Sequence, residues 1–139
     1  MKKTLPILLL FICVFATSCF SLTQKEKEYY IDKAQYVEAT GKVSHVRYNE
    51  EKHSLYLGFT ELNCTFDDNS FKIEGANYDI VKSKGVEINT GDTITFMTAP
   101  KYFGDGYIMP IVAVWKNGEC LLDFETGYKN LNKSLGNKI

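Results

Sequence analysis

Apolar and polar residues alternate along several short stretches of this chain, and this period of two predicts β-strands with one buried face. The clearest stretches are residues 55–60 and 93–98. A longer run, residues 36–48, contains Gly41, and an internal glycine in such a run indicates a bulge or a sharp bend. Residues 117–118 are Asn-Gly, which predicts a tight hairpin because both residues readily adopt a positive φ.

A change of period after the third predicted strand indicates one short helix. The third strand covers residues 71–75, and Asn77 is then a candidate cap for a helix that ends at Gly85. Two further strands follow, and Pro110 in the second of them indicates a bulge or a sheet edge. After the Asn-Gly turn, residues 120–124 read as a last strand that Gly127 ends.

The order strand, strand, strand, helix, strand, strand is the connectivity of the OB barrel, the oligonucleotide- and oligosaccharide-binding fold. The sequence therefore predicts a mainly β domain, a small OB-like barrel of five to six strands with one short helix. A small two-sheet sandwich is the alternative. We place this domain at residues 35–131, with residues 128–131 as a final helical turn and residues 132–139 as a polar tail.

The beginning of the chain has the features of an export signal. Lys2-Lys3 precedes an apolar run, residues 5–15, that is too short to span a bilayer as a helix. Residues 16–18 are small, which suits signal peptidase, and together with Cys19 they resemble a bacterial lipobox. We expect a signal peptide at residues 1–18 and lipidation of Cys19; plain secretion and an uncleaved anchor are the alternatives.

A polar segment separates the leader from the predicted domain. Residues 19–34 are largely polar and charged, and we interpret them as a tether. Residues 29–31 (Tyr-Tyr-Ile) either begin a short helix or lie against the domain.

Four segments resemble small exported OB-like domains of uncharacterised bacterial proteins. They are Ala-Thr-Gly-Lys-Val at 39–43, Thr-Gly-Asp-Thr-Ile-Thr-Phe at 90–96, Pro-Ile-Val-Ala-Val at 110–114 and Leu-Leu-Asp-Phe-Glu at 121–125. The resemblance covers about residues 36–131. It implies a barrel that is exported to the cell envelope, and it names no ligand.

The charge of the chain argues against nucleic acid as a partner. The formal net charge is -1, and removing Lys2 and Lys3 with the leader leaves fewer basic than acidic residues. Proteins that bind nucleic acids without sequence preference depend on neutralising phosphates with a basic surface.

Candidate catalytic and metal-binding residues are few. The two histidines, His45 and His53, are not at a ligand spacing, and no Cys-x-x-Cys, Gly-x-Ser-x-Gly or phosphate-binding loop occurs. Residues 67–69 (Asp-Asp-Asn) could hold a hard cation or form a solvated turn. Asp123 and Glu125 would share one face of a strand, as an acid/base pair or as two solvated carboxylates. We expect no enzyme, no metal and no cofactor.

The aromatic loop between the fourth and fifth predicted strands is the candidate binding site. In an OB barrel this loop flanks the ligand groove, and its rings can stack on sugars or on side chains of another protein. Alternatively, the rings fold back and cover the end of the barrel. The candidate residues are Tyr102, Phe103 and Tyr107 in the loop, with Tyr48 and Tyr56 on the first hairpin.

Cys64 and Cys120 are candidates for a disulfide, because export allows oxidation and both lie near predicted strand ends. Two separate buried thiols are the alternative.

These observations lead to a functional hypothesis. We expect a non-catalytic binding module held at the cell envelope by a lipid anchor, which presents an OB-like face to a protein, a peptide or a glycan. A structural lipoprotein without a small ligand is the alternative, followed by a hydrolase.

Overall fold

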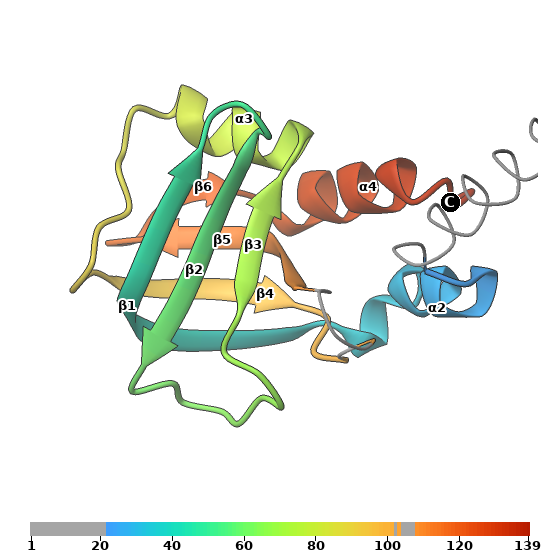
Figure 1. Ribbon diagram of the computed structural model, residues 1–139, viewed down its shortest axis with the longest axis horizontal. Coiled ribbons are helices and arrows are strands. Elements are labelled where there is room, and N and C mark those ends of the chain that lie inside the picture. Colours follow the sequence, from blue (N-terminus) through green and yellow to red (C-terminus); the bar gives the residue numbers. More distant parts are fainter. Residues whose placement is uncertain (1–21, 102, 104–107) are drawn as a thin grey trace, which may run out of the picture.

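The computed structural model describes residues 22–101, 103 and 108–139. The protein is mainly β, as the alternating pattern predicts, with one sheet of six strands and few helices (Figure 1). None of the helices in the described residues is long and apolar enough to cross a membrane. The strands are β1 (Val37–Asn49), β2 (Ser54–Thr60), β3 (Phe71–Glu74), β4 (Thr93–Thr98), β5 (Met109–Lys116) and β6 (Glu119–Leu122). The helices are α2 (Gln24–Glu28), α3 (Ala76–Ser83) and α4 (Phe124–Ser134), with two 3-10 turns, η1 (Tyr29–Ile31) and η2 (Lys33–Gln35).

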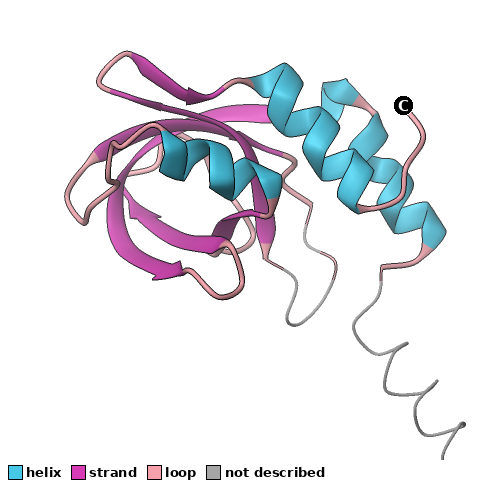
Figure 2. Cartoon of the chain, turned by 90° about the horizontal axis from the view of Figure 1, so that it is seen from above, coloured by secondary structure: helices cyan, strands magenta, loops and turns pink. Residues whose placement is uncertain are grey.

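The first five strands, which we call the ring, are closed by hydrogen bonds. Strands β3, β2, β1, β4 and β5 pair in that order, each antiparallel to its neighbour. A short parallel pairing between β3 and β5 closes the ring, and β6 extends it beside β5 (Figures 1 and 2). A closed ring removes most of the unpaired strand edges that promote aggregation.

Strand β1 is long because it pairs with two different neighbours. Its first part pairs with β4 as far as Lys42, and from Lys42 onward it pairs with β2. The register shifts between Val43 and His45, so the irregularity lies after Gly41 and not at it. At Gly41 a β-carbon would lie 2.7 Å from Leu62 Cδ2. The glycine therefore makes room for the side chain of Leu62.

The interior of the ring is the main apolar core. Three phenylalanines pack at its centre, and the rings of Phe59 and Phe96 stack with their centroids 4.6 Å apart. Phe71 lies edge-on to both. Other fully buried members are aliphatic and come from all five strands, for example Ala39, Leu55, Ile73, Ile94 and Ile111. This burial of apolar area is the chief source of stability for the ring.

A second core joins the two ends of the chain to the outside of the ring. We call residues 22–35 together with 124–139 the helical end. Tyr30 is fully buried, and its carbonyl oxygen accepts hydrogen bonds from Tyr36 Oη (2.8 Å) and Asn132 Nδ2 (3.0 Å). Asn137 Nδ2 donates to the carbonyl oxygen of Lys27 (2.8 Å). The remaining apolar members of this core are Ala99, Val112, Tyr128 and Leu131.

This second core corrects two sequence-based interpretations. The expected tether, residues 19–34, is helical from Gln24 onward and packs against α4 through Tyr30. The expected polar tail from residue 132 is also part of the fold, because α4 continues to Ser134 and Asn132 is fully buried. Both segments are largely polar in sequence, but each contains a few buried residues that contact distant parts of the chain.

Helix α4 crosses β5 in close backbone contact, and a glycine at the crossing is required. A β-carbon on Gly127 would lie 1.7 Å from the carbonyl oxygen of Val112. Gly127 therefore lies within helix α4. The sequence-based prediction that it ends the last strand is wrong. The preceding strand stops at Leu122, because Asp123 caps the helix and accepts a hydrogen bond from the backbone N–H of Thr126 (2.9 Å). This bond also lowers the pKa of Asp123.

The short helix and the hairpin lie where the sequence predicts them, with one difference in capping. Helix α3 follows β3 and ends just before Gly85, while Asn117 and Gly118 adopt φ values of 52° and 76°. The N-cap of α3 is Gly75, and no side chain caps it. Asn77 is instead buried and donates to the carbonyl oxygen of Gly127 (3.1 Å), which ties α3 to α4.

Candidate functional site

The outer face of β1, β2 and β3 carries a shallow groove of about 320 Å³, which we call the Tyr56 groove. Strand β1 and strand β2 supply two sides of it, and the chain just before β3 and before β5 supplies the rest. Its lining includes His45, Arg47, Tyr56, Gly58, Ser70 and Ile108.

Strand register explains why these residues meet. Arg47 is paired with Tyr56, and His45 with Gly58, across the β1–β2 ladder. Because side chains alternate across a strand, these positions share the outer face while Leu55 points into the ring core. Sequence reasoning found Tyr56 but missed the three residues paired with it or beside it. Pairing the two strands about the turn at residues 49–53 would have revealed them.

Arg47 and Tyr56 form a planar platform in the groove. The guanidinium carbon of Arg47 lies 4.4 Å from the centroid of the Tyr56 ring, within cation–π distance. Arg47 is exposed and Tyr56 is half-buried. No carboxylate among the described residues pairs with Arg47. Its N–H donors can therefore bind a carboxylate or another acceptor supplied from outside.

The floor and one wall of the groove are held in place by the backbone. A β-carbon at Gly58 would lie 3.4 Å from both the backbone oxygen of Asn69 and His45 Cβ, so the glycine leaves the space between these two groups open. The amide of Asn69 pairs with the backbone of Phe59, donating to its oxygen (2.6 Å) and accepting from its nitrogen (2.9 Å). These two bonds fix the β2–β3 loop against β2.

Phe103, the one candidate ring of the aromatic loop that is described, does not line this groove, although Ile108 at the end of the same loop does. Phe103 packs edge-on against Tyr29 and Tyr30, with ring centroids 5.5 and 5.8 Å away. It thus joins the second core. Tyr102 and Tyr107 lie outside the described residues.

Tyr48 also lies apart from the groove, on the opposite face of β1. Its hydroxyl accepts a hydrogen bond from the N–H of Ile88 (3.0 Å), and the Lys82 ammonium lies 5.2 Å from its ring centroid. The structure therefore places only Tyr56, among the described aromatic candidates, in the groove. Tyr48 instead fastens the segment that leads from α3 to β4.

The two described cysteines are free thiols, so the disulfide expected between them is absent. Cys64 lies in the loop between β2 and β3, half-buried against the ring core, and this burial raises the pKa of its thiol. Cys120 is exposed on β6, beside the hairpin. The two residues therefore belong to different elements with different surroundings. Cys19, the expected lipidation site, lies outside the described residues.

Two of the carboxylates singled out in the sequence, those of Asp123 and Glu125, make structural contacts. Asp123 caps α4, and Glu125 forms an ion pair with Lys33 (3.0 Å), so the two do not share a strand face. Within the described part of the chain, no three or more His, Cys, Asp or Glu side chains are grouped so that they could hold a metal ion.

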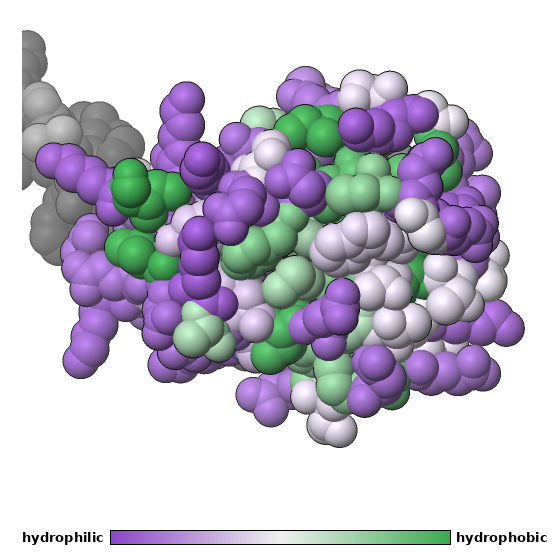
Figure 3. All heavy atoms as spheres, turned by 180° about the vertical axis from the view of Figure 1, so that it is seen from behind, coloured by the Kyte–Doolittle hydropathy of each residue, from purple (hydrophilic) through white to green (hydrophobic). Residues whose placement is uncertain are grey.

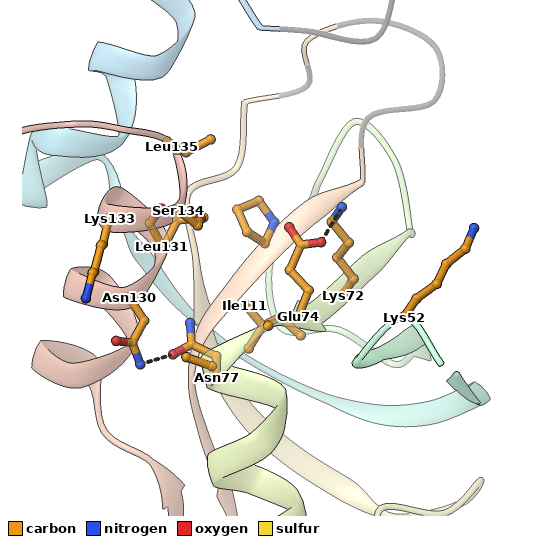
Figure 4. Close-up of a pocket in the computed structure, with 13 residues that line it drawn as sticks. Lys52, Lys72, Glu74, Asn77, Ile111, Asn130, Leu131, Lys133, Ser134 and Leu135 are labelled. Atoms are coloured by element: carbon orange, nitrogen blue, oxygen red, sulfur yellow. Dashed lines mark hydrogen bonds and ion pairs between the residues drawn. The ribbon is translucent and has the colours of Figure 1, made fainter. Parts of the chain in front are cut away.

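A larger cleft of about 700 Å³ lies between β3, the start of α3 and α4 (Figure 4). Polar side chains line it, but many of them bind one another. Lys72 pairs with Glu74 (3.0 Å), and Asn130 donates to Asn77 (2.9 Å). Because Asn77 also binds Gly127, these contacts connect α4 to α3. We assign this cleft a role in joining the two helices.

No family model, curated protein or solved structure matches this chain. A functional proposal therefore rests on the Tyr56 groove and on the leader that the sequence predicts.

Proposed function

We propose that this protein is a lipoprotein of the cell envelope whose ring is an OB-type barrel. In this proposal the Tyr56 groove binds a short acidic segment without catalysis. The segment belongs to another envelope protein, to a peptide or to a glycan. The order of strands around the ring, with a short helix between β3 and β4, supports the OB assignment. OB barrels bind ligands on the face of their second and third strands, where this groove lies.

The observation that carries the proposal is the stacking of Arg47 on Tyr56. A half-buried ring orients the guanidinium, so less side-chain freedom is lost when its donors bind an acceptor. His45 lies next to this pair, and the lining of the groove contains no carboxylate among the described residues. The groove therefore favours a ligand with a negative group and a flat face that can stack.

The ligand we propose is a short acidic segment and not a long polyanion. The chain without its two leader lysines contains 14 basic and 17 acidic residues, by subtraction of Lys2 and Lys3 from the total of 16. This overall negative charge repels a nucleic acid at long range. A short peptide or oligosaccharide would contact the groove alone.

Attachment to the membrane rests on the leader, with Lys2-Lys3, the apolar run of residues 5–15 and Cys19. Mass spectrometry of the exported protein should find Cys19 as an acylated N-terminal residue. An unmodified N-terminus at or beyond residue 19 would show that there is no lipid anchor.

The groove can be tested by NMR titration with defined probes: an oligoglutamate peptide, an oligosaccharide of uronic acids and a neutral chitin oligosaccharide. We expect the acidic probes to shift the backbone amides of Arg47, Tyr56 and Gly58, and the neutral probe to do so much less. Arg47→Ala should weaken binding at least about tenfold, as loss of a charge-assisted bond does. Lys42→Ala, an exposed cation on the same strand outside the groove, is the matched control and should change binding little.

A structural lipoprotein without a ligand is the second candidate, because Phe103 of the aromatic loop packs into the second core. If no acidic probe shifts the amides of the groove, the binding proposal is wrong and this second candidate is favoured.

A further inference from the structure

The helical end of the molecule is basic, whereas the rest of the domain is acidic. Residues 22–35 and 124–139 contain six lysines and four acidic residues, a net charge of +2. Residues 36–123 contain eight basic and thirteen acidic residues, a net charge of -5. An asymmetry of this kind orients a protein in the field of a charged surface.

An open hollow of about 810 Å³ lies on the helical end, and we call it the α4 hollow. Ile31 and Tyr128 contribute to its apolar lining, and Ile139 is 58% exposed at its margin. Figure 3 shows strongly apolar side chains on this end of the molecule among hydrophilic ones. Ile139 is one of only two large hydrophobic residues that are exposed in the described part of the chain.

Three lysines on the margin of the hollow are available to bind an anion. Glu125, the acidic residue in the lining, is already paired with Lys33 (3.0 Å). Lys129, Lys133 and Lys138 are exposed, and none of them pairs with a carboxylate among the described residues. Apolar groups framed by lysines are the features of a surface that lies on anionic lipid headgroups.

The short distance along the chain from Cys19 to the helical end indicates that a lipid membrane covers the α4 hollow. Helix α2 lies beside the C-terminal end of α4, where Asn137 binds the backbone of Lys27 (Figures 1 and 2). Cys19 precedes Leu22 by three residues, which span at most about 11 Å. A lipid on Cys19 would therefore bring the bilayer to the helical end. This step rests on the lipid anchor of the proposed function.

We propose that the α4 hollow and its three lysines lie on an anionic lipid membrane and so orient the whole domain. The lysines contact the headgroups, and Ile139 enters the interface. Strand β2 and the second half of β1, which carry most of the Tyr56 groove, lie away from α2 (Figure 1), so the groove stays accessible to a partner. Near an anionic surface each lysine contributes about fivefold in binding.

Co-sedimentation with vesicles tests this without the lipid anchor. Every described member of the two apolar cores lies at or after Leu22, so a chain of residues 20–139 retains all of them. It should bind vesicles that contain phosphatidylglycerol, bind less at high salt, and bind pure phosphatidylcholine vesicles weakly. The triple variant K129E/K133E/K138E should lose on the order of 100-fold or more in binding.

The control variant K42E/K52E/K84E carries the same charge change on exposed lysines of β1, of the turn after it and of the C-terminal end of α3, and it should lose much less. Equal losses in the two triple variants, or equal binding to both vesicle types, would overturn the proposal. Self-association in the absence of lipid that the first variant abolishes would also overturn it, since a second copy would then occupy the hollow. If the first variant is unfolded by circular dichroism, replacing the same lysines by glutamine gives the same test. The mass of Cys19 and the groove titration involve no vesicles, so those two proposals fail or stand independently.

Discussion

The ring and the helical end each enclose an apolar core, but the two cores are built from different side chains. The ring is filled by phenylalanine and aliphatic residues packed face to face or edge to face. The helical end is filled largely by tyrosines, and hydrogen bonds from Tyr36, Tyr128 and Asn132 run to backbone oxygens inside or beside it. The stability of the ring core depends mainly on how well its side-chain volumes fill the interior. The stability of the second core depends also on the geometry of its hydrogen bonds.

The separation of the partners along the sequence also differs. Antiparallel hairpins bring many ring residues together from nearby parts of the chain. In the helical end, Asn132 binds a carbonyl 102 residues away and Asn137 binds one 110 residues away. The helical end therefore forms only when both ends of the chain are in place, and we expect it to be the more sensitive of the two to small changes.

The largest effect should come from the crossing of α4 over β5. Gly127→Val should lower the free energy of unfolding by about 3 kcal/mol or more, because its β-carbon would overlap the Val112 carbonyl and displace the helix. Gly136→Ala is the control, since the space around Gly136 is open and only its positive φ of 78° opposes a side chain. That change should cost about 1 kcal/mol. Urea unfolding measures both, and a Gly127→Val protein as stable as the control would contradict the close crossing.

A matched pair of substitutions would separate packing from hydrogen bonding. Asn132→Leu keeps the number and branching of the side-chain heavy atoms but removes hydrogen bonds to Tyr30, Tyr128 and Asn137, and it should cost about 2 kcal/mol. Phe96→Leu in the ring loses the stack on Phe59 and should cost about 1 kcal/mol. If Asn132→Leu left the stability unchanged in thermal and urea unfolding, a dependence on hydrogen bonds would not distinguish the two cores.

The smallest effect concerns pH. The bond from Thr126 lowers the pKa of Asp123 in the folded state, so this carboxylate adds stability above its unfolded pKa of about 3.9. That stability is lost as the pH falls below 3.9 through the lowered folded value. Asp123→Asn keeps a capping side chain but cannot titrate. The difference in stability between the two proteins, followed by urea unfolding between pH 6 and 3 (about the range of carboxylate titration), should therefore shrink on acidification. A constant difference would rule out this contribution.

The strands of the ring could be predicted from the sequence because apolar and polar residues alternate along them and the turns contain characteristic residues. The period of residues 93–98 and the Asn-Gly pair at 117–118 each depend on local chemistry alone. The short helix after β3 was also found, although Asn77 was assigned the wrong role. Capping and burial both suit asparagine, and only the position of α4 decides between them.

The helical end was predicted only at residues 29–31 and 128–131, because little in the local sequence marks the rest of it. Tyr30 lies in a three-residue apolar stretch between charged residues, and it is buried by contacts about a hundred residues away. Gly127 has a poor helix propensity, yet it occupies the middle of α4 because the crossing with β5 admits no β-carbon. The groove was found in part: Tyr56 stood out as an aromatic residue, whereas Arg47 became significant only through the register of β1 and β2.

The most direct test asks whether the N-terminal segment belongs to the folded domain. Two chains, starting at residue 22 and at residue 36, should be compared by urea unfolding. Deleting residues 22–35 removes the buried Tyr30 together with the partners of Asn132 and Tyr128. We predict that the shorter chain loses about 3 kcal/mol or more of its unfolding free energy, as loss of a large buried aromatic residue does. Equal stability of the two chains would contradict the account and return the segment to the role of a free tether.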